Sequence, residues 1–503
     1  MTPLPATSLA CAGCGARVPA GSSRPFRCPR AGPDGVDHVV AKRLDPRRVR
    51  FPTDGDANPF VRYRELFHSY HVARRGGFGD ADYVTMVRRL DRDVAEVDGA
   101  GFRVTPFAHS AALSERLGFS APGGVWVKDE TGNVGGSHKG RHLMGVALHL
   151  EVLERLGRAT PEAAGGPRLA IASCGNAALA AAVIARAAGR SLDVFVPAEA
   201  DPGVLDRLAS LRARVEVCRR PEGSRGDPCL ARFRAAVDAG AVPFGCQGSE
   251  NGLSIEGGET LGYEMVSALR AEGARLDRLF VQVGGGALAS ACVQAFRAAV
   301  SLGVAPAAPR IHAVQTEGAF PLRRAYDRVR DRILARLPEM AEEGGGGGAT
   351  REGPRGGAVP AGGGLALGRA GAAGLVDEEA VAELLRGRTR STPVEEALCY
   401  AARHRSEFMW PWEETRRSVA SGILDDETYD WHAVVSGTIE SGGWPLVVSE
   451  PTLREAHDLA RAATGIRVSH TGAAGLAGLI ELRRSGSAAP GELVAVLFTG
   501  VER

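Results

Sequence analysis

The chain has 503 residues, of which 44% are hydrophobic and 24% are charged, and its formal net charge at neutral pH is +2. That length predicts two or three domains, and the balanced charge argues against nucleic acid or an anionic membrane surface as a partner. Every hydrophobic run is too short or too interrupted to cross a membrane. We therefore expect a globular protein with neither nucleic acid nor membrane as a partner.

The first 50 residues form a segment rich in cysteine, proline and glycine, with little helical pattern. Residues 58–95 have the apolar spacing that is typical of helices. Residues 125–128 then predict a strand, and residues 141–156 predict a helix with one apolar face.

From residue 169 to residue 315, predicted strands and helices alternate. Strands are expected at 169–173, 192–196, 214–217, 279–283 and 311–315, and helices at 177–188, 202–211, 229–239, 255–271 and 287–300. This alternation is typical of parallel sheets covered by helices on both faces. The sequence therefore predicts an α/β protein.

Residues 343–374 are dominated by glycine, and we expect a disordered insertion because they contain too little apolar surface to order themselves. Helical pattern resumes at 376–385. Beyond it, strands are expected at 446–448 and 493–498, and helices at 453–463 and 473–483. The α/β pattern therefore continues after the insertion.

Lysine is rare in this chain. Arginine and lysine together number 61, yet the lysines are only Lys42, Lys128 and Lys139. Arginine can supply surface charge, but it cannot form an imine with a carbonyl compound. Lys139 lies in a turn of small residues just ahead of a predicted helix, so it is the candidate for a Schiff-base lysine.

Three further turns follow predicted strands, at the edge where parallel sheets bind ligands. Ser173-Cys174-Gly175-Asn176 opens a helix whose free amides could hold a carboxylate, although an ordinary helix cap at Asn176 explains the pattern equally well. Backbone amides of Gly284-Gly285-Gly286 could wrap a phosphate, although a tight turn is the simpler interpretation. Thr499 places a hydroxyl at the end of the last strand, where an ordinary strand-end residue is the alternative.

Taken in order, these motifs resemble those of the fold-type-II pyridoxal-phosphate enzymes, and within them threonine synthase and its dehydratase and lyase relatives. The resemblance runs from about residue 105 onward. It rests on Lys128, Glu130, Asn133, Gly136, Ser137, Lys139 and Arg141, on Asn251, Glu256, Gly257 and Thr260, and on Glu450, Ala473, Ala474, Leu476, Ala477, Gly478 and Leu479. It implies a tryptophan synthase β-like fold with two parallel-sheet domains and the cofactor in the cleft between them.

The resemblance also implies domain boundaries. A Cys-rich head would span residues 1–50. A large cofactor-binding domain would comprise 51–134 and 251–503, and it would include the insertion at 343–374. A small domain at 135–250 would carry the Schiff-base lysine, and the protein would form a homodimer.

The roles of individual residues follow from the same resemblance. Lys139 would form the Schiff base with pyridoxal phosphate and shuttle the substrate α-proton. Asn176 would contact the phenolic oxygen of the cofactor, and Thr499 its ring nitrogen. Gly284, Gly285 and Gly286 would hold its phosphate. Ser173, Cys174 and Gly175 would bind the substrate.

Several positions depart from the pattern of threonine synthases. His138 and Gly140 stand where Phe and Asp are usual, Val134-Gly135 replaces Pro-Thr, and Cys174 replaces a hydroxyl residue. These changes leave the substrate open, and we hypothesise that His138 tunes access or substrate choice.

The implied function is a lyase or replacement enzyme that acts on a small amino acid by β- or γ-elimination, as threonine synthase does. A serine/threonine dehydratase or ammonia-lyase is the alternative enzyme. A non-catalytic protein that binds pyridoxal phosphate as a sensor or assembly partner is the alternative outside enzymes.

The head contains Cys11-x-x-Cys14 and Cys28, which look like half of the zinc ribbon that some threonine synthases carry. A structural zinc site needs four ligands, and His38 could supply the fourth, as could Asp34 or Asp37. A ribbon that has lost its metal is an equal alternative.

The remaining cysteines are scattered, and their total of nine is odd. This pattern predicts reduced thiols and a cytoplasmic location.

Overall fold

The computed structural model describes residues 5–53, 55–158, 167–219, 227–337, 377–413 and 417–503. The glycine-rich segment at 343–374 lies outside this part of the chain, so its predicted disorder stays a prediction.

The larger sheet has six strands in the order β11-β10-β9-β12-β4-β3. Their bounds are β3 Phe107–His109, β4 Gly124–Asp129, β9 Arg278–Gln282, β10 Arg310–Thr316, β11 Leu446–Val448 and β12 Leu493–Phe498. Neighbouring strands run parallel, except that β3 pairs with β4 in antiparallel fashion at one edge. Strands far apart in sequence, such as β4 and β12, therefore end at the same side of the sheet.

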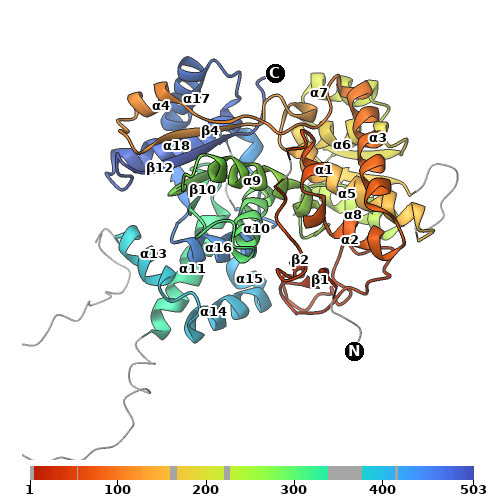
Figure 1. Ribbon diagram of the computed structural model, residues 1–503, viewed down its shortest axis with the longest axis horizontal. Coiled ribbons are helices and arrows are strands. Elements are labelled where there is room, and N and C mark those ends of the chain that lie inside the picture. The colour runs from red at the N-terminus through yellow and green to blue at the C-terminus, as the bar shows by residue number, and fades with distance from the viewer. Residues whose placement is uncertain (1–4, 54, 159–166, 220–226, 338–376, 414–416) are drawn as a thin grey trace, which may run out of the picture.

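The smaller sheet is wholly parallel, with four strands in the order β7-β6-β5-β8. These strands are β5 Leu169–Ala172, β6 Leu192–Pro197, β7 Arg214–Cys218 and β8 Val242–Pro243. In Figure 1 its helices α6, α7 and α8 lie on the opposite side of the molecule from β12 and β4 of the larger sheet.

Helices account for most of the remaining described residues. The α-helices are α1 Pro59–Arg62, α2 His68–Arg75, α3 Asp80–Asp98, α4 Ala111–Arg116, α5 Lys139–Arg155, α6 Asn176–Ala187, α7 Pro202–Ser210, α8 Pro228–Asp238, α9 Ser254–Ala271, α10 Ala287–Ser301, α11 Pro321–Arg336, α13 Glu378–Arg386, α14 Thr392–Arg403, α15 Arg405–Phe408, α16 Trp431–Ser441, α17 Glu450–Thr464 and α18 His470–Arg484. Short 3₁₀ helices are η1 Arg64–Leu66, η2 Val134–Gly136 and η3 Ser421–Ile423.

The α/β class predicted from the alternating pattern is confirmed, with two sheets of mainly parallel strands. Two of the predicted helical segments differ from the structure. The helical stretch expected at 58–95 is divided into α1, α2 and α3. Helix α5 was expected to bury one face, but every residue from 140 to 150 is buried. A helix that is buried on all sides belongs to the core. Lys139 is therefore the first residue of a firmly packed helix.

Helix α5 packs closely against α9, and glycine makes the approach possible. A Cβ atom added at Gly145 would lie 2.8 Å from the Cα of Gly257, closer than a real side chain comes to backbone. The two helix backbones therefore touch at this crossing, which fixes α5 relative to the centre of the molecule.

The cysteine-rich head contains an antiparallel pair, β1 Thr7–Cys11 and β2 Val40–Leu44. It contacts both halves of the molecule, below the centre of Figure 1. The Arg24 guanidinium donates to the carbonyl of Ala241 beside β8 at 2.8 Å, and Asp37 pairs with Arg405 of α15 at 3.3 Å. The head thus bridges the smaller sheet and the helices around the larger one.

Within the described residues, no helix combines the length and the apolar character that a membrane crossing requires.

Candidate active site

Lys139 is the first residue of α5, and a tight turn leads into it. Gly135 and Gly136 both have positive φ, at 68° and 67°, where a residue with a Cβ is strained. The amide of Gly135 donates to the Asp98 carboxylate at 2.8 Å. Glycine at 135, one of the departures from the threonine synthase pattern, is therefore required by the shape of this turn.

A buried network of charged side chains holds the start of α5. Arg141 donates to Glu130 at 2.7 Å and to Glu264 at 2.6 Å, and all three side chains are at most 1% exposed. Lys128 donates to the same Glu264 and to the carbonyl of Thr105. Lys128, Glu130 and Arg141 of the motif thus have a structural role and fix the position of Lys139.

The last strand brings Thr499 next to the lysine turn. The amide of His138 donates to the Thr499 carbonyl at 3.2 Å, and Ser137 forms a β-bridge with Gly500. The His138 ring also donates through Nδ1 to the Thr499 carbonyl at 3.2 Å. Residues 361 positions apart in sequence therefore meet at one point.

Gln282, the last residue of β9, orients the Thr499 hydroxyl. Its side-chain nitrogen lies 2.6 Å from Thr499 Oγ1 and 2.7 Å from the Gly472 carbonyl. A carbonyl can only accept, so this end of Gln282 is the amide NH₂, which donates to Thr499. The hydroxyl proton of Thr499 is left free to donate to a ligand.

Asn176 is oriented in a similar way. Arg503 donates to Asn176 Oδ1 and, at 2.6 Å, to the carbonyl of Gly135. Because Arg503 occupies the oxygen of Asn176, the Nδ2 donor is available, close to Gly500 at the end of the last strand. Asn176 is thereby tied to both the lysine turn and the end of β12.

Gly284, Gly285 and Gly286 lie between β9 and α10, and a second segment packs on them. Side chains at these positions would meet Asp425, Tyr429 and Thr428 respectively. Gly286 has a φ of 93°, and Thr428 donates to the Gly284 carbonyl at 2.9 Å. Absence of side chains is therefore needed for this packing, whatever ligand the amides at the start of α10 bind.

Asp430 connects the glycine loop to the loop after β8. Its amide donates to the Gly285 carbonyl at 3.1 Å, and its Oδ2 accepts from the Gly248 amide at 3.1 Å. The side chain is buried, and Oδ1 has no partner among the described residues. Burial and the charge of Asp37 raise the Asp430 pKa from its ordinary value to about 7, although the hydrogen bond from the Gly248 amide and the charge of Lys139 oppose the rise.

The turn at 173–175 sits at the start of α6 with Cys174 exposed and Ser173 half-buried. Partial burial raises the pKa of the Cys174 thiol, and the negative charges of Asp227, Asp425 and Glu199 raise it further. Three carboxylates are therefore close enough to act on this turn.

His138, which directly precedes Lys139, is buried and packs edge to face on His142. Burial, with Lys139 and His142 nearby, lowers the pKa of its imidazole well below the usual value. The ring is neutral, and its Nδ1 proton is bonded to the Thr499 carbonyl. The hypothesis that it tunes substrate choice stays a prediction.

A family model described as pyridoxal-phosphate dependent enzyme matches residues 100–355 of this chain. The match covers half of the sequence, and Lys139, Asn176 and the three glycines lie within it. The chain belongs to the pyridoxal-phosphate-dependent enzyme family. The resemblance identified from the sequence motifs is thereby confirmed.

One curated relative is a threonine synthase from Methanosarcina acetivorans, which is 28% identical over 238 residues. The aligned region covers 47% of this chain and 52% of the relative, so the chain matches about half of that protein's length.

Solved structures of this family share the fold. The diaminopropionate ammonia lyase from Escherichia coli has a TM-score of 0.53 at 14% identity, and the match covers 89% of this chain and 91% of that one. The serine racemase from maize has a TM-score of 0.50 at 15% identity, with 83% of this chain and 93% of that one covered. At these identities the likeness supports the fold alone, and it confirms the fold-type-II class predicted from the sequence.

The donors in this site fit pyridoxal phosphate. Asn176 and Thr499 each have a free donor, the cofactor's phenolic oxygen and ring nitrogen are acceptors, and the α10 amides suit a phosphate. Carboxylates at Asp430 and Asp425 would oppose the phosphate, but the pKa of Asp430 near 7 makes its neutral form the main one below neutral pH. Three residues that shape the site were not identified from the sequence: Gln282, Arg503 and Asp430. Of these, only Gln282 gave a signal, as a polar residue ending a buried strand.

The head brings Cys11, Cys14, Cys28 and His38 together, with their ligand atoms all within 4.8 Å of one another. Burial opposes ionisation of Cys14, yet hydrogen bonds from the Ala16 amide, the other two thiols and His38 lower its pKa to about 7. Both oxygens of Asp34 lie 3.1 Å from His38 Nε2, so Asp34 orients the ring. Of the three residues considered for the fourth position, His38 is the one in this cluster.

Proposed function

We propose that the protein is a lyase or replacement enzyme of this family that acts on a small amino acid by β- or γ-elimination, as threonine synthase does. The observation that carries the proposal is the position of Lys139 at the start of α5, directly after the residue bonded to Thr499. A homodimer in the cytoplasm remains our expectation for its assembly and location.

The bound cofactor would supply an electron sink for the carbanion formed at the substrate α-carbon. Lys139 would hold the cofactor and carry the α-proton. The Thr499 hydroxyl would donate a hydrogen bond to the ring nitrogen and keep its proton, which leaves that nitrogen uncharged. Asn176 would donate to the phenolic oxygen, and the amides of Gly284, Gly285 and Gly286 would bind the phosphate.

The small domain is proposed at residues 135–250, with the large domain at 51–134 and 251–503. In support, strands β5 to β8 and helices α5 to α8 all fall between residues 139 and 243.

We also propose that the head, residues 1–50, holds a structural zinc ion through Cys11, Cys14, Cys28 and His38. Three thiol sulfurs and one imidazole nitrogen are a common tetrahedral zinc set.

A serine/threonine dehydratase or ammonia-lyase is the second candidate, and one observation favours it. Asp425 acts electrostatically on Cys174 and lies against Gly284, so it is close to both the proposed substrate turn and the phosphate loop. Asp227 and Glu199 also act on Cys174, so this turn suits a substrate without a phosphate group better than a phosphorylated one.

Turnover assays distinguish these candidates. The cofactor-loaded protein is incubated with O-phosphohomoserine, L-serine or L-threonine, with Lys139→Ala as the inactive control. Phosphate release would support a threonine synthase, whereas ammonia and a 2-oxo acid would support the lyase. Bound cofactor without turnover of any of the three would overturn both enzyme proposals and favour a sensor.

A further inference from the structure

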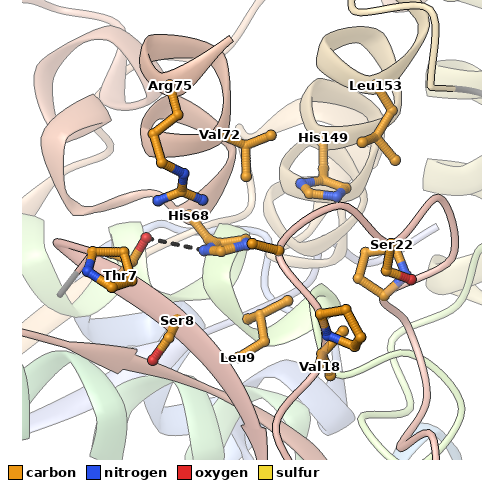
Figure 2. Close-up of a pocket in the computed structure, with 14 residues that line it drawn as sticks. Thr7, Ser8, Leu9, Val18, Ser22, His68, Val72, Arg75, His149 and Leu153 are labelled. Atoms are coloured by element: carbon orange, nitrogen blue, oxygen red, sulfur yellow. Dashed lines mark hydrogen bonds between the residues drawn. The ribbon is translucent and has the colours of Figure 1, made fainter. Parts of the chain in front are cut away.

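A small cavity lies away from the candidate active site, where the head meets α2 and α5. Its volume is about 40 Å³, and it is lined by Thr7 of β1, His68 and Arg75 of α2, and His149 of α5. Figure 2 shows these side chains around one space, with the His68 ring between Thr7 and His149. A space of this size holds a few water molecules or one small ion.

His149 is the most informative residue of this cavity. Its side chain is 2% exposed, yet neither ring nitrogen has a hydrogen-bond partner among the described residues. Buried polar atoms are almost always paired, so a ring with two unpaired nitrogens that lines a cavity indicates a ligand. Burial lowers the pKa of His149 to about 4, so the ring is neutral and donates through one nitrogen only.

The second donor comes from Thr7. Its Oγ1 lies 2.9 Å from His68 Nδ1, and the two rings of His68 and His149 stack 5.9 Å apart. When His68 donates from Nδ1, Thr7 accepts and its own proton is free to donate. Burial lowers the His68 pKa well below its usual value, and His149, Arg75, Lys42 and His71 lower it further.

Arg75 supplies the charge at the exposed end of the cavity. No acidic side chain pairs with it in the part of the chain that the structure describes, and its pKa is lowered by burial and by Arg158. The buried acid Glu256 accepts from the His68 amide and is paired with Lys42 at 3.4 Å. The cavity therefore combines hydrogen-bond donors with an unneutralised cation.

We propose that this cavity binds a small free oxyanion of the size of phosphate. The Arg75 guanidinium would contact two of its oxygens, and His149 and Thr7 would each donate to another. Guanidinium groups bind oxyanions in this two-point manner, and the small volume suits an anion of this size. Because His149 belongs to the helix that starts at Lys139, the ligand would join the head to that helix.

The test uses the cofactor-loaded protein, so that the phosphate site of the cofactor is already filled. Sodium phosphate is titrated by calorimetry at constant ionic strength, with sodium chloride as the reference salt. We expect saturable phosphate binding with a Kd of about 1 mM, as suits one charged pair and two neutral hydrogen bonds. Phosphate should also raise the thermal unfolding midpoint more than chloride does.

Two neighbouring arginines provide the matched comparison. Arg75→Ala should weaken phosphate binding about tenfold or more, because it removes the only charged contact. Arg74→Ala should leave it unchanged, since that exposed side chain donates to the Phe78 carbonyl instead. Arg75→Gln tests the charge at nearly constant length and should behave like Arg75→Ala. Absence of saturable binding, or equal affinity in the Arg75 variants, would overturn the proposal and leave water as the occupant.

Discussion

At the scale of single residues, all three lysines lie in the interior or at its edge. The side chain of Lys128 is fully buried, that of Lys42 is 9% exposed, and Lys139 is half-buried at the start of α5. Lys42 donates to Glu259 at 2.6 Å, a role that the sequence did not reveal. Rarity of lysine therefore marked buried positions, and only the surrounding motif distinguished Lys139 from the other two.

The candidate site could be predicted only in part. Lys139, Asn176, the glycine loop and Thr499 each follow a strand or open a helix, so local pattern located them. Gln282, Arg503 and Asp430 contribute through contacts with residues far along the chain, and no local spacing encodes such contacts. The segment that covers the glycine loop was missed for the same reason.

Asp430 should make stability depend on pH. Its pKa in the folded protein is about 7, whereas the ordinary value is 3.8, so between these values the folded state binds the extra proton. Its contribution is therefore present below about pH 4 and is lost as pH rises through 7. We expect Asp430→Asn in the cofactor-free protein to increase the free energy of unfolding by about 2–4 kcal/mol at pH 8, and to change it little at pH 4.

Urea unfolding at several pH values measures this difference. Asp458→Asn is the control, because that side chain is 83% exposed, and its curve should follow the parent protein. If Asp430→Asn and the parent protein show parallel curves from pH 4 to pH 8, Asp430 does not titrate as described.

At the scale of elements, the long parallel strands and their helices were predictable because each carries its own apolar pattern. The pairing of β1 with β2, the antiparallel edge strand β3 and the two-residue strand β8 were not. Such short strands are defined by the partners they bond, not by their own side chains. Burial of residues 140–150 of α5 likewise depends on packing against other helices, among them α9, which lies about 100 residues further along the chain.

The element that positions the candidate site is α5, held by the buried ions around Arg141. We expect Arg141→Met to lower the free energy of unfolding by about 3–5 kcal/mol, because it leaves Glu130 and Glu264 buried with one cation fewer. Arg155→Met on the same helix should cost less than about 0.5 kcal/mol, since its side chain is 35% exposed.

Denaturant unfolding of both variants checks this expectation. Equal losses of stability in the two variants would show that the buried network does not anchor α5.

At the scale of the whole molecule, the head connects the two halves through Arg24 and Asp37. Its cluster of three cysteines and His38 should therefore affect the stability of the whole molecule and not only that of the head. We expect the purified protein to contain about one zinc ion per chain by elemental analysis, and Cys14→Ser to lose it. Removal of zinc with a chelator should lower the thermal unfolding midpoint, because binding energy of the metal contributes to folding.

Cys399→Ser is the control for the metal analysis, as Cys399 is exposed and outside the cluster. A head that is folded, free of metal and insensitive to chelator would contradict the zinc proposal.

The central claim is that Lys139 carries the cofactor, and borohydride reduction tests it most directly. The protein loaded with pyridoxal phosphate is reduced, digested and mapped by mass spectrometry, which is unambiguous because the chain has three lysines. We predict loss of the visible absorbance on reduction, a stable adduct on the peptide containing Lys139, and no visible band in Lys139→Ala. An adduct on Lys42 or Lys128, or an unchanged band in Lys139→Ala, would contradict the account.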